Sequence, residues 1–408
     1  MDPTTAPAAA LDAADPLAGF RDRFAVDDVP GAPLAYLDGN SLGRPPRRTL
    51  ERLRHLHETG WAVDLIRGWD RWQHLPTEVG DALGAAVLGA APGQVVVADS
   101  TSVLLFKALH AALALRPGRT RLVASAGDFP TDRYLVEAVA ARSGGEVRWL
   151  RPDPAEGLGA DEVVAAVDER TAAVLLSHVD YRSAALADLR AVTAGAHAAG
   201  AVVVWDLSHS AGAVPLALDA DGVDLAVGCT YKYLCAGPGA PAFLFAAARH
   251  HEQLDNVVPG WFGADDVFAM AGEWVPAAGI RRMVSGTPPV PGLVAVDEGV
   301  RLVGEAGTDR IREKSVALTS RAVARLDTVA RPHGWRLASP RDADRRGSHV
   351  VVGGPGAREV EQRMRARGVL ADFRHPDLVR LGLSPLTTSF AELDAALDVV
   401  EAALGGSG

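Results

Sequence analysis

Two stretches decide the fold: Ala201-Val-Val-Val-Trp-Asp-Leu-Ser-His209, and the shorter Asp224-Leu-Ala-Val-Gly-Cys-Thr-Tyr-Lys-Tyr233. Each begins with an apolar, β-branched run and continues into polar residues, which predicts two parallel strands joined as one strand-helix-strand unit. Asp206 and Lys232, 26 positions apart (232 minus 206), would then lie at one edge of the sheet. Open α/β sheets bind their ligands at this edge, beyond the carboxyl ends of the strands.

A lysine and a carboxylate are the two side chains that pyridoxal phosphate (PLP) requires. The PLP aldehyde forms a Schiff base with a lysine, and a carboxylate keeps its pyridine nitrogen protonated. Gly228, Gly237 and Gly239 suit a loop that approaches a ligand closely. Taken singly, Asp206 is better explained as a turn residue and Lys232 as a half-exposed side chain with a packed stem. Together with these glycines, they predict a PLP site.

Composition restricts the class of protein. The chain has 408 residues, 48% of them hydrophobic, and a formal charge of -10, which favours a globular protein and disfavours a nucleic-acid binder. Its two cysteines match neither a zinc site nor a disulfide framework, and its first residues do not resemble a signal peptide. No apolar run reaches membrane-spanning length. We therefore expect a cytoplasmic protein without membrane or nucleic-acid partners.

The order of elements predicts an α/β fold in two domains. Short apolar runs at 94–98, 121–124, 172–176, 201–205, 224–227 and 242–245 alternate with helical stretches, which indicates a mostly parallel sheet covered by helices on both faces. A long helix over 297–328, strands at 349–352, 369–373 and 379–381, and a helix over 390–404 predict a smaller α+β domain. The expected parts are an N-terminal segment 1–45 that packs with the small domain, a large domain 46–297 and a small domain 298–408.

Three further motifs are candidates for ligand contacts. Ser100, Thr101 and Ser102 begin a predicted helix that extends to about residue 115, where hydroxyl groups and backbone N–H groups bind phosphate or simply cap the helix. Phe129 could stack on a planar cofactor. The Pro-Thr-Asp sequence that follows it also suits a turn, with Phe129 as an aromatic core residue. Arg380, inside an apolar run, could bind a substrate carboxylate or face water on an edge strand.

Two other kinds of site are rejected. The twelve histidines show no His-Glu-x-x-His motif and no Cys/His repeat, so no metal site is expected. The nearest nicotinamide fingerprint, Gly237-Pro-Gly239, leads into a strand instead of opening a helix.

The chain resembles kynureninase, a family of fold-type I PLP enzymes. The segments that carry the resemblance are Tyr36-Leu-Asp-Gly-Asn-Ser-Leu-Gly43, Ala98-Asp-Ser-Thr-Ser-Val103, Asp128-Phe-Pro-Thr-Asp132, Trp205-Asp-Leu-Ser-His-Ser-Ala-Gly-Ala-Val-Pro215, Gly228-Cys-Thr-Tyr-Lys-Tyr-Leu234, Gly260-Trp-Phe-Gly263 and Arg380-Leu-Gly-Leu-Ser-Pro-Leu386. The resemblance implies hydrolysis of the Cβ–Cγ bond of L-kynurenine or 3-hydroxykynurenine, giving L-alanine and anthranilate or 3-hydroxyanthranilate, in tryptophan catabolism.

The resemblance also implies roles for individual residues. Lys232 would be the Schiff-base lysine, Asp206 the partner of the pyridine nitrogen, and Tyr231 a proton donor and phosphate ligand. Further cofactor contacts are implied for Thr101, Ser102, Phe129, Thr131, Asp132, Ser177 and His209. Trp261 and Thr287 match positions that reach the phosphate of the neighbouring subunit, which implies a homodimer. Arg380, Asn40 and Ser41 would bind the substrate.

The departures from the family pattern leave alternatives open. Leu104 and Cys235 stand where the family commonly has Asn, and Ser183-Ala184 where it commonly has Thr-Gly. These changes are either neutral repacking or a sign of a ring-modified kynurenine from secondary metabolism. A PLP cysteine desulfurase is disfavoured, because Cys229 and Cys235 lie beside the lysine and not on a separate loop. A PLP-binding protein without catalysis would not need a carboxylate-binding arginine.

Overall fold

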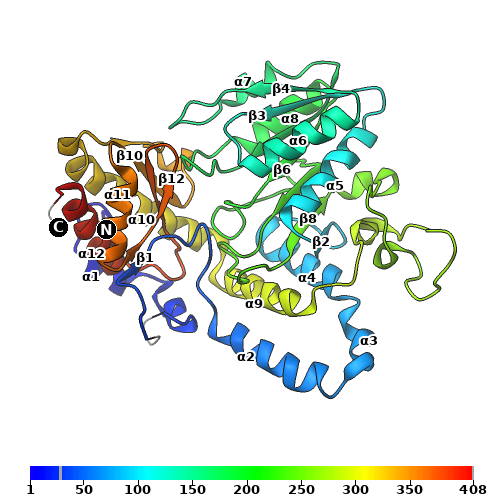
Figure 1. Ribbon diagram of the computed structural model, residues 1–408, viewed down its shortest axis with the longest axis horizontal. Helices are drawn as coiled ribbons and strands as arrows, with labels where there is room; N and C mark the ends of the chain where they lie inside the picture. The colour runs from blue at the N-terminus through cyan, green and yellow to red at the C-terminus, as the bar shows by residue number, and fades with distance from the viewer. Residues whose placement is uncertain (27–29, 407–408) are drawn as a thin grey trace.

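A seven-stranded sheet forms the larger part of the computed structural model, which describes residues 1–26 and 30–406 (Figure 1). In the spatial order β2-β8-β7-β6-β5-β3-β4, its strands are β2 (Val95–Ala98), β8 (Ala242–Ala246), β7 (Leu225–Gly228), β6 (Val202–Asp206), β5 (Thr171–Ser177), β3 (Arg121–Ser125) and β4 (Glu146–Leu150). Strand β8 runs antiparallel to both of its neighbours, and the other pairs are parallel. The mostly parallel sheet predicted from the sequence is confirmed.

Helices cover both faces of this sheet, and each face has its own apolar core. On one face lie α5 (Thr101–Ala114) and α6 (Pro130–Arg142). On the other lie α4 (Leu75–Leu83), α7 (Ala160–Val164), α8 (Leu189–Ala198) and α9 (Val290–Ala306). The central strands are buried on both sides, which explains why their sequences are continuously apolar instead of alternating.

Two details of the sheet differ from the prediction. The segment between β6 and β7 consists of turns over residues 207–224 and contains no helix, so the expected strand-helix-strand unit is wrong there. Strand β4 was not predicted, because its sequence Glu-Val-Arg-Trp-Leu lacks a continuous apolar run. It lies at the edge of the sheet, where one buried face is enough to hold a strand.

The smaller part contains a four-stranded antiparallel sheet, shown on the left of Figure 1. Its strands are β12 (Asp372–Arg374), β13 (Leu378–Gly382), β10 (His349–Gly353) and β9 (Arg336–Leu337), and its helices are α10 (Thr308–Val329), α11 (Ala357–Ala366) and α12 (Phe390–Leu404). The N-terminal segment joins this part: α1 (Ala8–Ala14) packs on α12, and β1 (Ala35–Tyr36) pairs with β11 (Val369–Leu370). From there α2 (Arg47–His55) and α3 (Trp69–Trp72) lead back to the large sheet.

The long helix predicted over 297–328 is in fact two helices, α9 and α10, separated at Gly307. Gly307 has φ +83°, a conformation that a side chain disfavours and that ends a helix. The break lets α9 pack on the large sheet while α10 packs on the small one. Neither of these helices, nor any other within 1–26 and 30–406, is long and apolar enough to cross a membrane.

A buried aspartate, Asp224, links several elements at the amino-terminal ends of the parallel strands. These ends lie opposite the carboxyl ends that carry Asp206. Asp224, 1% exposed, accepts hydrogen bonds from the Val203 N–H and from Arg249, and it contacts the Nε2 atoms of His197 and His250, all at 2.7 to 2.8 Å. Burial alone would raise the pKa of this carboxyl group, but the hydrogen bonds lower it well below its usual value.

Replacing Asp224 with Ala should therefore lower the free energy of unfolding at pH 7 by about 3 to 5 kcal/mol, because buried donors lose their partner. A carboxyl group whose pKa is lowered by folding stabilises the protein above its unfolded pKa of about 3.9. The difference between wild type and variant should thus shrink as the pH falls below about 4. Denaturant titrations across pH test this, with exposed Glu169→Gln as the control; a difference independent of pH would contradict the assignment.

Candidate functional site

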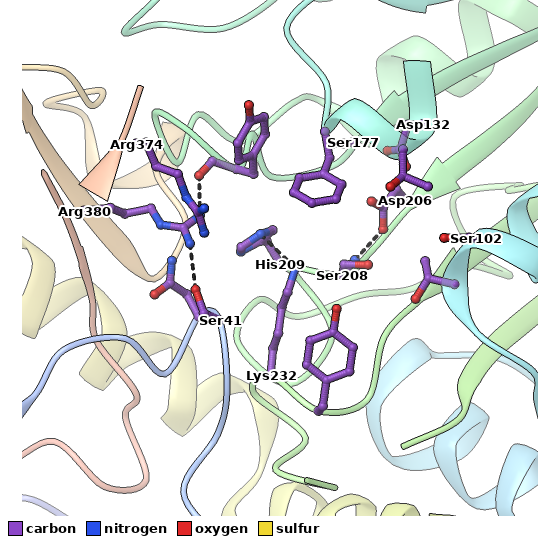
Figure 2. A pocket seen from close by; sticks show the side chains of 16 residues that line it. Ser41, Ser102, Asp132, Ser177, Asp206, Ser208, His209, Lys232, Arg374 and Arg380 are labelled. Atoms are coloured by element: carbon purple, nitrogen blue, oxygen red, sulfur yellow. Dashed lines mark hydrogen bonds between the residues drawn. The ribbon is translucent and has the colours of Figure 1, made fainter. Parts of the chain in front are cut away.

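One pocket lies where the carboxyl edge of the large sheet meets the small domain and the N-terminal segment (Figure 2). Its volume is about 190 Å³. Of the residues predicted from the sequence, it collects Asn40, Ser41, Thr101, Ser102, Phe129, Thr131, Asp132, Ser177, Asp206, His209, Tyr231, Lys232 and Arg380. Segments more than 300 residues apart in the sequence therefore meet in one place, as the sequence predicts.

Strand register explains why the acidic end of the pocket forms. Ser177 ends β5 directly beside Asp206, which ends β6, and Asp206 in turn pairs with Val227 of β7. The Ser208 N–H donates to Asp206 Oδ1 at 2.8 Å, which fixes the direction of the carboxylate. The sequence therefore turns sharply after β6 and presents the acid at the strand end.

Asp132 and Asp128 add two buried carboxyl groups beside Asp206. Burial raises the pKa of Asp132 well above its usual value, and the nearby charge of Asp206 raises it further. Burial, followed by the charge of Asp180, raises the pKa of Asp128 to about 8. Asp128 therefore holds a proton at neutral pH, and a hydrogen bond with Asp206 contributes to the raised pKa of Asp132.

Lys232 differs from the other two lysines of this chain in the group that its amine contacts. Lys107 Nζ and Lys314 Nζ each lie 2.7 Å from an aspartate oxygen, of Asp99 and Asp15 respectively. Lys232 Nζ instead lies 3.0 Å from Nε2 of His209 (Figure 2). Burial, followed by the charge of Lys232, lowers the pKa of His209 well below its usual value, so the imidazole is neutral and can accept a hydrogen bond from the amine.

A candidate anion site lies at the start of α5. Ser100 caps the helix and accepts a hydrogen bond from the Val103 N–H at 3.4 Å. The next two residues, Thr101 and Ser102, occupy the first turn and line the pocket. Free N–H groups, the helix dipole and two hydroxyl groups at one point suit a phosphate.

Aromatic side chains line two other parts of the pocket. Phe129, just before α6, makes an edge contact with Tyr181 at 5.3 Å between ring centroids. Burial raises the pKa of Tyr231, so its phenol keeps its proton and can act as a donor. The Tyr231 carbonyl also accepts a hydrogen bond from the Gly43 N–H at 2.8 Å, which links the N-terminal segment to the loop that carries Lys232.

The side of the pocket away from Asp206 comes from the N-terminal segment and the small sheet (Figure 2). Arg380 on β13 is 1% exposed and donates from Nη2 to Ser41 Oγ at 2.8 Å. Asn40 is fully buried, and neither polar atom of its amide has a hydrogen-bond partner among the described residues. Because unsatisfied buried amide groups are costly, this side of the pocket suits a polar ligand.

Three lining residues were not predicted as site residues: Tyr181, Ser208 and Arg374. Ser208 follows Asp206 by two positions, so its place in the pocket could have been inferred from the turn after β6. Arg374 shares strand β12 with Asp372, which pairs with Arg380 across the small sheet. That pairing between strands could not be read from the sequence alone.

Trp261 and Thr287 lie outside the pocket of their own chain. Trp261 begins the short helix η6 (Trp261–Gly263) and is 39% exposed, with its ring against Phe262. Thr287 is also exposed. The structure therefore leaves both free to face another molecule.

Comparison with known proteins identifies relatives along the whole chain. The family model described as the kynureninase C-terminal domain matches residues 311–400. The kynureninase of Deinococcus radiodurans is 42% identical over 402 residues, which cover 97% of this chain and 95% of the relative.

Solved structures of lower identity share the fold. The cysteine desulfurase CsdA of Escherichia coli has a TM-score of 0.81 at 17% identity and covers 95% of this chain and 98% of its own. A C-DES variant with glycine covalently linked to its PLP cofactor has a TM-score of 0.78 at 20% identity, covering 90% and 96%.

Gly43 offers a test of how the N-terminal segment shapes the site. A Cβ atom there would lie 2.3 Å from the Lys232 carbonyl oxygen and 2.6 Å from Cys235 Sγ. We expect Gly43→Ala to displace the Lys232 loop and to weaken PLP binding by about tenfold or more, since overpacking costs roughly 1 to 3 kcal/mol. Absorbance titration of the apoprotein with PLP measures this. Gly19→Ala, which meets no atom within 4 Å, should bind PLP normally; normal binding by both variants would contradict the expectation.

Proposed function

Because this chain belongs to the kynureninase family, we propose that it hydrolyses the Cβ–Cγ bond of L-kynurenine, or of 3-hydroxykynurenine, in tryptophan catabolism. The products are L-alanine and anthranilate or 3-hydroxyanthranilate. The observation that carries the proposal is one pocket with Asp206 on one side, Arg380 on the other and Lys232 between them (Figure 2). A lysine with no acid partner among the described residues, an acid at the strand end and a buried guanidinium group are what a PLP enzyme acting on an amino acid needs.

The residues of the pocket fit PLP as the cofactor. Asp206 would bind the pyridine nitrogen, Thr101, Ser102 and Tyr231 the phosphate, and Lys232 the aldehyde carbon. Phe129 would cover the ring, with Thr131, Asp132, Ser177 and His209 around it. The donors at the start of α5 and the carboxylate at the end of β6 come from different elements, so phosphate and ring nitrogen would each have their own partners. When bound, PLP withdraws electrons from the substrate carbon that carries the amine.

The remaining chemistry is performed by side chains of this chain. Lys232 Nζ, freed by the substrate amine, removes the α-proton, and the neutral His209 beside it accepts a hydrogen bond from the amine. Asp206, oriented by the Ser208 N–H, balances the positive charge of the pyridine nitrogen. Water supplies a hydroxyl group to Cγ, the Cβ–Cγ bond breaks, and Cβ receives a proton. Tyr231, whose raised pKa keeps it protonated, is the proposed donor. Lys232 then returns the α-proton to Cα, so that the net change is the addition of one water.

The positions that depart from the family pattern favour neutral repacking over a new substrate. Leu104 is fully buried in the core between α5 and the sheet, and Cys235 belongs to the core of the opposite face. Within the described ranges, neither lines the pocket. Ser183 keeps hydrogen bonds to Asp180 from both its N–H and its hydroxyl group. A ring-modified kynurenine remains the second candidate substrate.

A cysteine desulfurase activity is disfavoured by the two thiols. Cys229 and Cys235 are 3% and 6% exposed. Burial raises the pKa of both thiols, and that of Cys235 to about 12, whereas a sulfur acceptor must be an accessible thiolate. The likeness to desulfurases at 17% identity therefore concerns the fold. A PLP-binding protein without catalysis is disfavoured by the buried Arg380.

We further infer the assembly, the domain boundaries and the location of the protein. A homodimer would let Trp261 and Thr287 of each subunit reach the phosphate site of the other. The proposed parts are an N-terminal segment 1–45, a large domain 46–297 and a small domain 298–408. The two free, buried cysteines are consistent with the cytoplasm.

The activity is tested by mixing PLP-loaded protein separately with L-kynurenine and 3-hydroxy-L-kynurenine and following the products by mass spectrometry. We expect alanine together with anthranilate or its hydroxylated form, and the ratio of kcat/KM values ranks the two rings. Lys232→Ala should lower kcat by about 10²- to 10⁴-fold, because it removes the base. Failure of the wild type to cleave either compound would contradict the proposal.

The shared site is tested separately with Thr287→Ala. If Thr287 contacts the phosphate of the neighbouring subunit, its loss should weaken PLP binding by roughly tenfold. Sedimentation should show a dimer both before and after the change. Unchanged PLP affinity, or a wild-type monomer that binds PLP tightly, would rule out the shared site.

A further inference from the structure

Arg380 has little hydrogen-bonding capacity left for a substrate. Its Nε donates to Asp372 Oδ1 at 3.0 Å, and its Nη2 donates to Asp372 Oδ2 at 2.5 Å and to Ser41 Oγ at 2.8 Å. Its Nη1 donates to the Tyr181 carbonyl at 2.6 Å. A guanidinium group has five N–H donors, so one remains. A bidentate contact with a substrate carboxylate would require an existing bond to break.

A second guanidinium group lines the same pocket. Arg374, two residues beyond Asp372 on β12, lies next to Arg380 in Figure 2. Its Nη2 contacts Asp372 Oδ2 at 2.6 Å, and its side chain is 35% exposed. Its Nε is buried and has no hydrogen-bond partner among the described residues. Arg374 thus lines the pocket and has more uncommitted N–H donors than Arg380.

One acid neutralises only part of this charge. Asp372 contacts both guanidinium groups. The other nearby acid is Asp38, whose pKa is raised to about 6 by burial and then by the charge of Asp372. A third carboxylate can join this cluster because it would meet two arginines and because Asp38 can take up a proton when negative charge accumulates.

We propose that Arg374 is a second substrate-binding residue, which holds the α-carboxylate of the substrate together with Arg380. Arg380 contributes its remaining Nη1 donor, and Arg374 contributes the donors of its partly exposed guanidinium group that Asp372 leaves unbound. Asp372 keeps the two guanidinium groups side by side and prevents Arg380 alone from binding the carboxylate in a bidentate manner. This inference rests on the proposed function for the identity of the substrate.

The test compares Arg374→Gln with Arg358→Gln. Arg358 is exposed on α11 and packs over the Phe373 ring, outside the pocket. We expect Arg374→Gln to raise KM for kynurenine by about 10- to 100-fold, the range for a lost charged hydrogen bond, with less effect on kcat and none on PLP affinity. Inhibition by kynuramine, which is kynurenine without its carboxylate, should be unchanged. Arg358→Gln should resemble the wild type.

An unchanged KM, or an equal loss of kynuramine binding, would overturn the inference. To distinguish direct contact with the substrate from an indirect effect through Asp372, the Arg374→Gln change is repeated in an Asp372→Asn background. A further rise in KM there supports direct contact, and no further rise shows that Arg374 only positions Asp372. If the wild type does not cleave kynurenine, the proposed function fails. Arg374 can still be tested by measuring the affinity for L-alanine through the change in cofactor absorbance. An unchanged affinity in Arg374→Gln would overturn its role.

Discussion

The site depends on a lysine amine that is held by a neutral histidine and not by a carboxylate. Lys232 Nζ lies 3.0 Å from Nε2 of His209, whereas Lys107 is paired with an aspartate inside the fold. An amine that is not held in a close ion pair is available to attack an aldehyde carbon. Asp206 is oriented by the Ser208 N–H at the end of β6.

Several distant segments must meet for this arrangement to serve catalysis. The large sheet supplies Asp206 and the Lys232 loop, and α5 supplies the anion site. The N-terminal segment crosses from the small domain to that loop, where the Gly43 N–H binds the Tyr231 carbonyl. The same segment pairs with the small domain through β1 and β11. The two sides of the pocket are therefore linked through backbone contacts of the N-terminal segment, so a change in that segment can affect both.

The sequence predicted the elements whose physical signal is local. Strands such as β6 are buried on both faces, so a short apolar run followed by a polar residue was enough to place Asp206. The edge strand β4 and the break at Gly307 were missed, because an edge strand needs only one apolar face and a glycine inside a helical pattern does not by itself end a helix. Arg374 was missed for another reason. Its position beside Arg380 depends on the antiparallel pairing of β12 with β13, which leaves no mark in the local sequence.

The most direct test of the central claim is to treat the PLP-loaded protein with borohydride and map the labelled peptide by mass spectrometry. The chain has three lysines, so the assignment is unambiguous. The account predicts a pyridoxyl group on Lys232 and an unmodified Lys107 and Lys314. A label on either of the other two lysines, or none on Lys232 in protein that binds PLP, would contradict it.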